Sequence, residues 1–233
     1  MEKHGIDICS ISETKRKGKG NIRYQNHILF YSGVDKDSRA QAGIGVLIHK
    51  NFENNIEDVK YINHNITIQA ERKRTHIMSI YAPDINKPKE KRESFFDTLQ
   101  ETLDHIPTKD RVFMISTLGS VIAVPREQFM HKFNEETLNE NGNILISLCA
   151  HNELRINNTY FDHKDQHTFA NTRGQKSTID YVITNRNVHP RQILDVRINL
   201  SNINLSKYTT WISTMQVSYG TNTTKKEEAQ LCL

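Results

Sequence analysis

The sequence is poor in cysteine, and its few thiols form no recognisable framework. Cys9, Cys149 and Cys232 are the whole complement, their number is odd, and no two of them stand in a C-x-x-C motif. A disulfide-stapled secreted domain or a zinc domain would show paired or regularly spaced cysteines. The pattern instead favours reduced thiols in an intracellular protein, with Cys9 and Cys149 in the core.

Long apolar runs are also missing. No stretch approaches the roughly 20 apolar residues that a membrane-spanning helix needs, and the N-terminal sequence MEKHGIDICS lacks the apolar segment of a secretory signal. We therefore expect a nuclear or cytoplasmic protein that is not secreted and has no membrane partner. The sequence also contains no P-loop and no nucleophile elbow, so neither kind of site is indicated.

The chain does have the composition of a folded, rather polar globular protein. It has 233 residues, of which 36% are hydrophobic and 25% charged, and this length can bury a sizeable core. No repeat, low-complexity block or linker interrupts it. We expect one domain over residues 1–217, followed over residues 218–233 by a polar C-terminal tail that frays from the fold.

Hydrophobic periodicity predicts strands that come in pairs at first and then alternate with helices. Apolar residues at helical spacing predict amphipathic helices within residues 87–107 and 135–154. Alternation and β-branched residues predict strands at 6–12, 27–33, 42–50, 65–71, 76–83, 111–116, 154–160, 177–186 and 193–200. This order indicates an α/β domain with a mixed sheet.

Positive charge is modest overall but locally concentrated. The formal net charge is +4 and the pI about 8.9, which is compatible with a polyanionic partner without requiring one. The segment TKRKGKG over residues 14–20 places Lys15, Arg16, Lys17 and Lys19 among two glycines. Such a cluster attracts phosphates and gives salt-dependent binding, although a solvated surface loop explains it equally well. These four residues are the candidate nucleic-acid contacts.

Several short motifs follow one another in a specific order. They read ISETKRKGKG (11–20), YSGVDKDSRAQAGIGVLI (31–48), SIYAP (79–83), NGNILISLCAHNELRINNTYF (141–161) and STIDYV (177–182). Each motif alone is weak, but together, over roughly residues 4–200, they resemble the endonuclease/exonuclease/phosphatase superfamily. More narrowly, the chain resembles the endonuclease domains of non-LTR (LINE) retrotransposons and the craniofacial development protein 2-like sequences.

This resemblance implies a fold and a chemistry. The fold is a four-layer α/β sandwich, in which two mixed β-sheets pack face to face and are flanked by helices. The chemistry is hydrolysis of a DNA phosphodiester. A carboxylate holds Mg²⁺, which polarises the phosphate, an aspartate activates the attacking water, and a histidine contacts the phosphoryl oxygen. The partner implied is DNA, or RNA.

Three residues stand where the family has functional groups. Glu13 matches the metal-binding glutamate, and the alternative is an ordinary surface glutamate. Tyr81 matches the tyrosine beside the phosphate, and the alternative is an ordinary tyrosine at a strand end. Asp180 matches the aspartate that orients the catalytic histidine. An aspartate between Ile and Tyr in an apolar strand is costly unless it has a partner, which supports a structured role.

Other positions depart from the family pattern. Where the strand RVFMIS ends, Thr117 stands at the catalytic aspartate and Gly119 at its asparagine neighbour. Near the end of the domain, Lys207 and Tyr208 stand at the closing aspartate and histidine. A threonine cannot serve as the carboxylate base, a glycine has no side chain to bind phosphate, and a lysine inverts the local charge. The family's first strand, with its asparagine, is expected to precede residue 1 and to be missing.

We therefore expect a degenerate endonuclease-like domain of retrotransposon origin, a pseudoenzyme with impaired or absent catalysis. One alternative is an active Mg²⁺-dependent endonuclease with a rearranged site, in which Asp84 or Asp110 lies near Glu13. Another is a nucleic-acid or protein binding module that uses the basic loop. The last is a product that does not fold stably, because a missing strand exposes sheet edges.

Overall fold

The computed structural model describes residues 7–40, 42–63, 65–70, 74–118, 138–162, 167–170, 176–199, 212–219 and 227–232. These residues form two large β-sheets and two α-helices, together with a two-stranded ribbon of β10 (Phe169–Ala170) and β11 (Lys176–Ser177). Short 3₁₀ helices link the strands at η2 (Lys50–Asn55), η3 (Asn157–Tyr160) and η4 (Pro190–Gln192).

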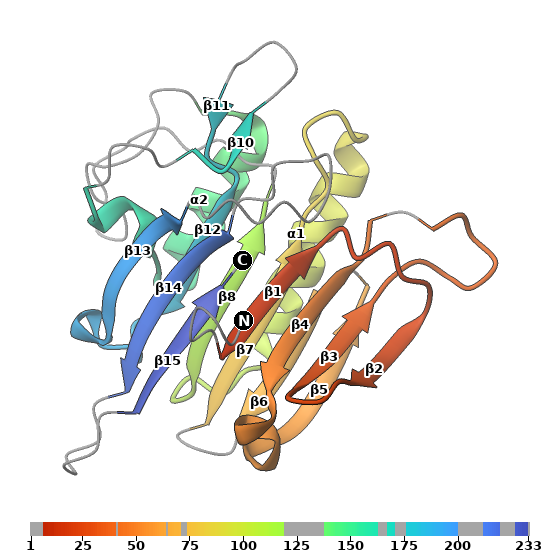
Figure 1. Cartoon of the computed structure of the whole chain (residues 1–233). Coiled ribbons are helices and arrows are strands. Elements are labelled where there is room, and N and C mark those ends of the chain that lie inside the picture. The colour runs from red at the N-terminus through yellow and green to blue at the C-terminus, as the bar shows by residue number, and fades with distance from the viewer. Residues whose placement is uncertain are drawn as a thin grey trace.

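The larger sheet has seven strands, in the spatial order β13 (Ile193–Asn199), β14 (Ile212–Tyr219), β15 (Glu227–Cys232), β1 (Ile8–Ser12), β4 (Ile44–His49), β3 (His27–Ser32) and β2 (Lys19–Arg23). Figure 1 shows this sheet face-on. Strands β1, β4, β3 and β2 form an antiparallel ladder. The end of β1 therefore lies beside the start of β4.

The second sheet has six strands, in the order β5 (Ile56–Ile62), β6 (Asn65–Ala70), β7 (Thr75–Tyr81), β8 (Arg111–Thr117), β12 (Asp180–Asn185) and β9 (Leu154–Ile156). Strands β7 and β8 run parallel, and the other pairs are antiparallel. A parallel pair needs a crossover connection, which helix α1 (Lys89–Asp104) supplies. As a result, the carboxyl ends of β7 and β8 meet at one edge of the sheet.

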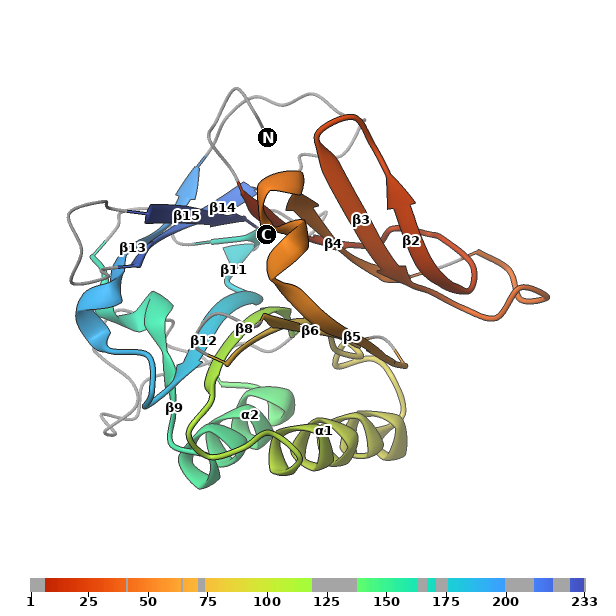
Figure 2. The same ribbon diagram turned by 90° about the horizontal axis from the view of Figure 1, so that it is seen from below.

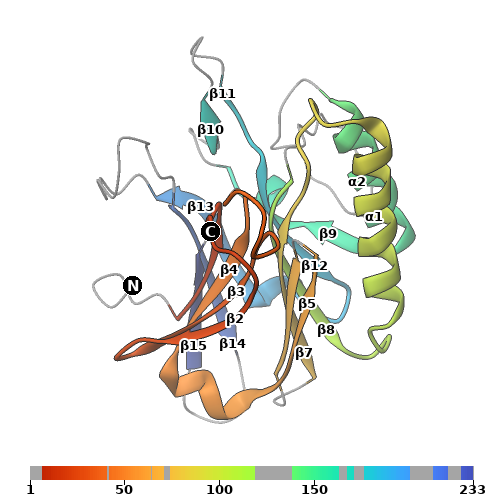
Figure 3. The same ribbon diagram turned by 90° about the vertical axis from the view of Figure 1, so that its right-hand side faces the viewer.

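The two sheets pack face to face, as Figures 2 and 3 show from two directions. Along β8, Phe113 and Ile115 point into the core between the sheets, whereas Val112 and Met114 point into a second core under the helices. All four side chains are buried. A strand that is apolar on both faces is what a sheet covered on both sides requires.

Both α-helices cover the outer face of the six-stranded sheet (Figure 2). Helix α1 buries Phe95, Phe96, Leu99 and Leu103, all on one face. Helix α2 (Glu140–His151) begins at Asn139, whose side chain accepts a hydrogen bond from the Gly142 N–H. The predicted α/β sandwich is confirmed, although none of the described helices covers the outer face of the seven-stranded sheet. Within the described ranges, no helix has the length and apolar character that crossing a membrane requires.

The C-terminal residues differ from the sequence prediction. Residues 218–233 were expected to form a frayed polar tail, but Glu227–Cys232 form β15, between β14 and β1. β15 pairs antiparallel with β14 and parallel with β1, where Cys9 is the register partner of Cys232. A strand between two neighbours is held by backbone hydrogen bonds on both sides, which need no particular side chains. The polar sequence of this segment therefore gave no signal.

Candidate active site

Three candidate residues lie in a row where strands of the six-stranded sheet begin or end. Tyr81 is the last residue of β7 and Thr117 the last of β8, and the two are register partners. Asp180, the first residue of β12, is the register partner of Thr117 on its other side. Neighbouring strands lie about 4.8 Å apart, so the three side chains share one edge of the sheet.

Glu13 reaches this row from the opposite sheet. It follows β1 directly, and its Oε1 accepts a hydrogen bond of 3.0 Å from the hydroxyl of Tyr81. Its φ of 54° lies in the left-handed region, which costs a non-glycine residue about 1–3 kcal/mol and therefore needs support from the surrounding structure. Nearby, the hydroxyls of Ser10 and Ser79 are 2.5 Å apart and join β1 to β7. Two hydrogen bonds thus fix Glu13 relative to Tyr81.

Asp180 has a neutral partner rather than a charged one. The hydroxyl of Thr117 donates a hydrogen bond of 2.6 Å to its Oδ1. Burial raises the pKa of Asp180, while hydrogen bonds from Thr117 and Thr168 act in the opposite direction. The carboxyl group is therefore costly to ionise, and the threonine hydroxyl offsets part of that cost.

Tyr81 lies between several carboxylates. Its burial and then the negative charge and hydrogen bond of Glu13 raise the pKa of the phenol well above its usual range. The charges of Asp84 and Asp180 add to this shift of the pKa. The hydroxyl therefore stays protonated at neutral pH and acts as a hydrogen-bond donor.

Two residues that support Asp180 were not found from the sequence. The hydroxyl of Thr168 accepts a hydrogen bond of 3.2 Å from the backbone N–H of Asp180. Asn158 Nδ2 donates to the Asp180 carbonyl at 3.2 Å, and its Oδ1 accepts from the Val182 N–H at 2.8 Å. Asn158 belongs to the NNTYF part of a quoted motif, which was the available signal, but spacing alone did not connect it to Asp180.

The basic loop over residues 14–20 is held in a defined shape. The Gly18 N–H donates to the Val34 carbonyl at 2.7 Å. A Cβ atom on Gly33 would lie 1.9 Å from the Arg16 carbonyl oxygen. The backbones of the loop and the turn therefore approach each other so closely that only glycine fits at this position.

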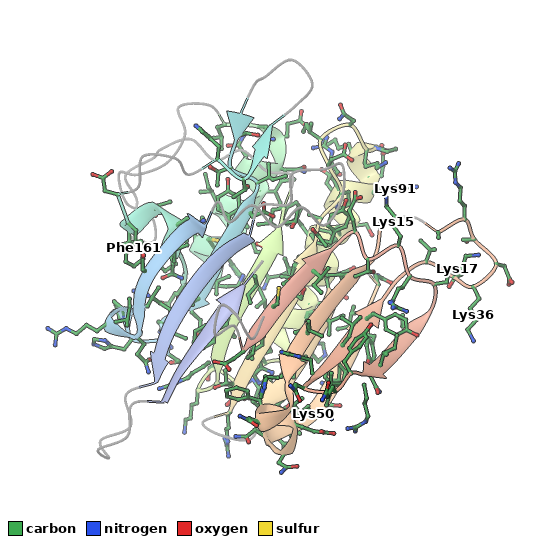
Figure 4. The ribbon with its side chains drawn as sticks, viewed as in Figure 1. Lys15, Lys17, Lys36, Lys50, Lys91 and Phe161 are labelled. Carbon is green, nitrogen blue, oxygen red and sulfur yellow. The ribbon has the colours of Figure 1, made fainter. Side chains whose placement is uncertain are left out.

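Two exposed lysines project from this loop. Figure 4 shows Lys15 and Lys17 at the same end of the sheet as Lys36, whereas Lys50 lies at the opposite end. Lys17 Nζ donates to the Lys36 carbonyl at 3.0 Å. These ammonium groups lie on the side where Glu13 leaves β1, so a phosphate chain crossing the candidate site would pass near them.

The other two cations of the loop contact two tyrosines, one through its ring and the other through its backbone. The guanidinium of Arg16 lies 5.3 Å from the centre of the Tyr31 ring, within the range of a cation–π contact. Lys19 Nζ donates to the Tyr61 carbonyl at 3.2 Å. Arg16 thus lies against β3 of the seven-stranded sheet, whereas Lys19 joins β2 to β5 of the six-stranded sheet.

The remaining predicted positions have different outcomes. Gly119, Lys207 and Tyr208 lie outside the described residues. The suggestion that Asp110 lies near Glu13 is wrong, because Asp110 immediately precedes β8 and so lies at the opposite end of that strand from Thr117.

Asp84 remains beside the site, in the loop that follows β7. Its charge acts on Tyr81, and its own Oδ1 caps the Asn86 N–H at 2.9 Å. Its carboxylate is exposed, and its Oδ2 lies 4.0 Å from Lys87 Nζ, so a ligand bound at the strand ends would compete with an exposed ion pair.

The residues present fit a divalent cation only in part. Mg²⁺ is often held by one or two carboxylates together with water and substrate phosphate oxygens. Glu13 can supply such a carboxylate, although its Oε1 already accepts a hydrogen bond from Tyr81. Among the described residues, no group of three or more His, Cys, Asp or Glu side chains could enclose a metal ion. The donor set suits an ion shared with a bound phosphate.

The fold has counterparts among solved structures. The endonuclease domain of TRAS1, a telomere-specific non-LTR retrotransposon, matches with a TM-score of 0.55 and 16% identity, over 86% of this chain and 82% of that one. An endonuclease/exonuclease/phosphatase family protein from Leptotrichia buccalis C-1013-b matches with a TM-score of 0.57 and 14% identity, over 94% and 89%. This chain has the endonuclease/exonuclease/phosphatase fold. A humanized D. rerio TDP2 is similar to it with a TM-score of 0.52 and 10% identity, over 81% and 75%.

Sequence comparison finds two curated relatives of the chain. Craniofacial development protein 2 of Bos taurus is 27% identical over 192 residues, which cover 78% of this chain and 32% of that protein. The Tragulus javanicus protein of the same name is 26% identical over 192 residues, 78% of this chain and 33% of that one. No family model matches the chain. The chain spans about a third of the length of these curated relatives, and the superfamily resemblance seen in the motifs is confirmed.

Proposed function

We propose that this chain is a nucleic-acid-binding, endonuclease-like domain of retrotransposon origin whose phosphodiester hydrolysis is impaired or lost. The contact between Thr117 and Asp180 carries the proposal. It lies at the strand end where the superfamily resemblance implies a water-activating carboxylate. A threonine hydroxyl is neutral at working pH, and this one already donates its hydrogen to Asp180. It cannot take a proton from water as a general base must.

The groups that remain are suited to binding rather than to proton transfer. Tyr81 presents a protonated phenol, and Glu13 offers a carboxylate that would hold Mg²⁺ together with a substrate phosphate. Such an ion, when bound, neutralises charge on the phosphate. Lys15 and Lys17 add positive charge beside this edge. Together these side chains would hold and orient a phosphate backbone, and none of them is placed to activate water.

A nicking assay on supercoiled plasmid tests the loss of hydrolysis. The assay contains about 5 mM Mg²⁺, enough to load a weak site with oxygen ligands. We expect the wild-type protein to cleave no faster than the Glu13→Gln variant. The two proteins differ by one charge at an exposed carboxylate, so both should fold. Robust Mg²⁺-dependent cleavage by the wild type that Glu13→Gln abolishes would overturn the proposal.

A binding assay tests the interaction with nucleic acid separately. Anisotropy of a labelled DNA duplex should show an affinity that falls with salt, because each phosphate contact releases counterions. Each contact contributes about −0.9 to the slope of log K against log salt concentration. The double variant Lys15→Gln/Lys17→Gln should reduce that slope by about 2. Lys50→Gln removes one positive charge at the opposite end of the sheet and should leave the slope unchanged. A salt-independent affinity would contradict this part of the proposal.

A second candidate function is an active Mg²⁺-dependent endonuclease with a rearranged site. The observation in its favour is Asp84, an exposed carboxylate whose charge acts on Tyr81. If the wild type cleaves DNA, Asp84→Asn should then abolish cleavage as completely as Glu13→Gln does. Cleavage that survives Asp84→Asn would exclude this arrangement.

A further inference from the structure

A pocket lies on the helix side of the six-stranded sheet, away from the strand ends that carry the candidate active site. Residues of β5, β6, β7 and α1 line it, and its volume is about 440 Å³. His76, which lines the pocket, and Tyr81, at the candidate site, are both on β7. At about 3.3 Å per residue, the two lie roughly 16 Å apart along the strand. The pocket is therefore separate from the phosphate-binding edge.

A buried pair of titratable side chains forms part of its wall. His76 Nε2 and Asp110 Oδ2 are 2.9 Å apart, and the two residues are only 6% and 2% exposed. Asn185 and Asn187 both donate to the Asp110 carbonyl, at 2.8 and 2.7 Å. The position of Asp110 is thus fixed from its backbone as well as from its side chain.

Two oxygen atoms of the lining residues have no donor. Asp110 Oδ1 and Thr67 Oγ1 are buried and make no hydrogen bond to any part of the chain that the structure describes. An unsatisfied buried polar atom costs stability, and most such atoms in native proteins have a partner. Both residues line the same pocket, so a molecule bound there could supply the missing hydrogen bonds.

The other lining residues limit what that molecule can be. The carboxylates of Asp58, Glu101 and Asp110 outnumber the ammonium of Lys60, which gives the pocket a net negative charge when its histidines are neutral. Anionic ligands such as phosphates are therefore disfavoured. The apolar surface comes from Ile62, Ile106 and Pro107. The pocket thus combines acceptors in its wall with apolar surface for the body of a ligand.

We propose that this pocket binds a small organic cation whose amidine, guanidinium or primary amine donates hydrogen bonds to Asp110 Oδ1 and Thr67 Oγ1. Hydrogen bonds between a charged donor and a carboxylate are short and about twice as strong as neutral ones. The apolar part of the ligand packs against Ile106 and Pro107. This activity needs no phosphodiester chemistry, so it does not depend on the function proposed above.

Benzamidine is a suitable probe, because it joins an amidinium to a flat apolar ring. Titration of the full chain, followed by calorimetry and by the NMR signals of the His76 ring, should show saturable binding. Benzoate has the same shape with the opposite charge and no N–H donor, and should bind at least tenfold more weakly. Asp110→Asn should weaken benzamidine binding at least tenfold, and Thr67→Val severalfold. Asp97→Asn removes a carboxylate from the exposed face of α1, outside the pocket, and should change nothing.

Several results would overturn the proposal. Absence of saturable binding would mean that the pocket holds water only. Equal binding of benzoate, or equal affinities for wild type, Asp110→Asn and Thr67→Val, would mean that a charged donor to these two oxygens is not what binds. Thermal unfolding will show whether Asp110→Asn folds. If it does not, Thr67→Val and Ile106→Trp decide the question, since the indole fills the pocket from its wall. Benzamidine affinity unchanged in both variants would contradict the proposal.

Discussion

Thr117 and Asp180 face each other across antiparallel strands, and the threonine hydroxyl donates a 2.6 Å hydrogen bond to the carboxyl oxygen. This one contact has two effects. It gives the partly buried carboxyl group of Asp180 a partner, which lowers the cost of its desolvation. It also uses the hydrogen of the hydroxyl, so Thr117 can only accept a hydrogen bond from a water molecule and, being neutral, cannot deprotonate it. The contact that supports Asp180 is therefore also the one on which the proposed loss of general-base chemistry rests.

Removing the hydroxyl should destabilise the protein. Thr117→Val keeps the shape of the side chain but leaves Asp180 Oδ1 without its donor, which should cost about 1–3 kcal/mol in the free energy of unfolding. Urea denaturation measures the loss. Thr117→Ser retains a hydroxyl and should lose less. Equal stability of wild type and Thr117→Val would show that the hydrogen bond contributes nothing.

Neutralising Asp180 should make stability less sensitive to pH. Because burial raises the pKa of Asp180, the folded state binds a proton more readily than the unfolded state, whose pKa is about 3.9. Wild-type stability therefore falls as pH rises from about 3.9 through the folded-state pKa. Asp180→Asn keeps the Oδ1 acceptor and lacks this penalty. It should be more stable than wild type at neutral pH.

The measurement is the difference in unfolding free energy between Asp180→Asn and wild type as a function of pH. That difference should be largest at neutral pH and should shrink as pH falls toward 4, roughly the unfolded-state value. The exposed Asp97→Asn variant controls for a general change in charge. A difference that grows toward low pH would mean that Asp180 is stabilised as an anion.

Gly33 should be essential for the basic loop. Alanine at this position would place its Cβ 1.9 Å from the Arg16 carbonyl oxygen, so the loop must move. We expect Gly33→Ala to weaken DNA binding severalfold, since Lys15 and Lys17 would lose their arrangement. In Gly20→Ala the nearest atom is the Tyr31 hydroxyl at 3.3 Å, the end of a long side chain, and binding should be retained. Anisotropy titrations compare the two.

Much of the fold followed from side-chain periodicity, and the missed strands show where that signal ends. β8 was predicted because it is apolar on both faces. β5 (Ile56–Ile62) was missed, because it is an edge strand with no fully buried residue. β15 was missed because its sequence is polar and the strand is held by backbone pairing with β14 and β1. Edge and inserted strands depend on pairing that only the folded chain provides.

The site was predictable only where a motif named the residue. The motifs singled out Glu13, Tyr81 and Asp180, whereas the hydrogen bond between Thr117 and Asp180 joins residues 63 positions apart. Such a contact depends on strand register, which the sequence did not specify. The same limit explains the error over Asp110. A residue just before a strand lies at the opposite end of the sheet from one just after it.

Tyr81→Phe should free the carboxylate of Glu13 from its hydrogen bond to the tyrosine hydroxyl. The change removes the hydroxyl that donates to Glu13 Oε1, and because Glu13 is exposed, water can replace the donor. The loss of stability should therefore be small, about 0.5–1.5 kcal/mol. With both of its oxygens free, Glu13 should bind a hard divalent ion more tightly, and titration with Mn²⁺ followed by electron paramagnetic resonance should show a severalfold lower Kd.

Glu13→Gln keeps an acceptor for Tyr81 but loses the charge, so it should bind Mn²⁺ more weakly than wild type. If Glu13→Gln and wild type bind Mn²⁺ equally, Glu13 does not anchor the ion.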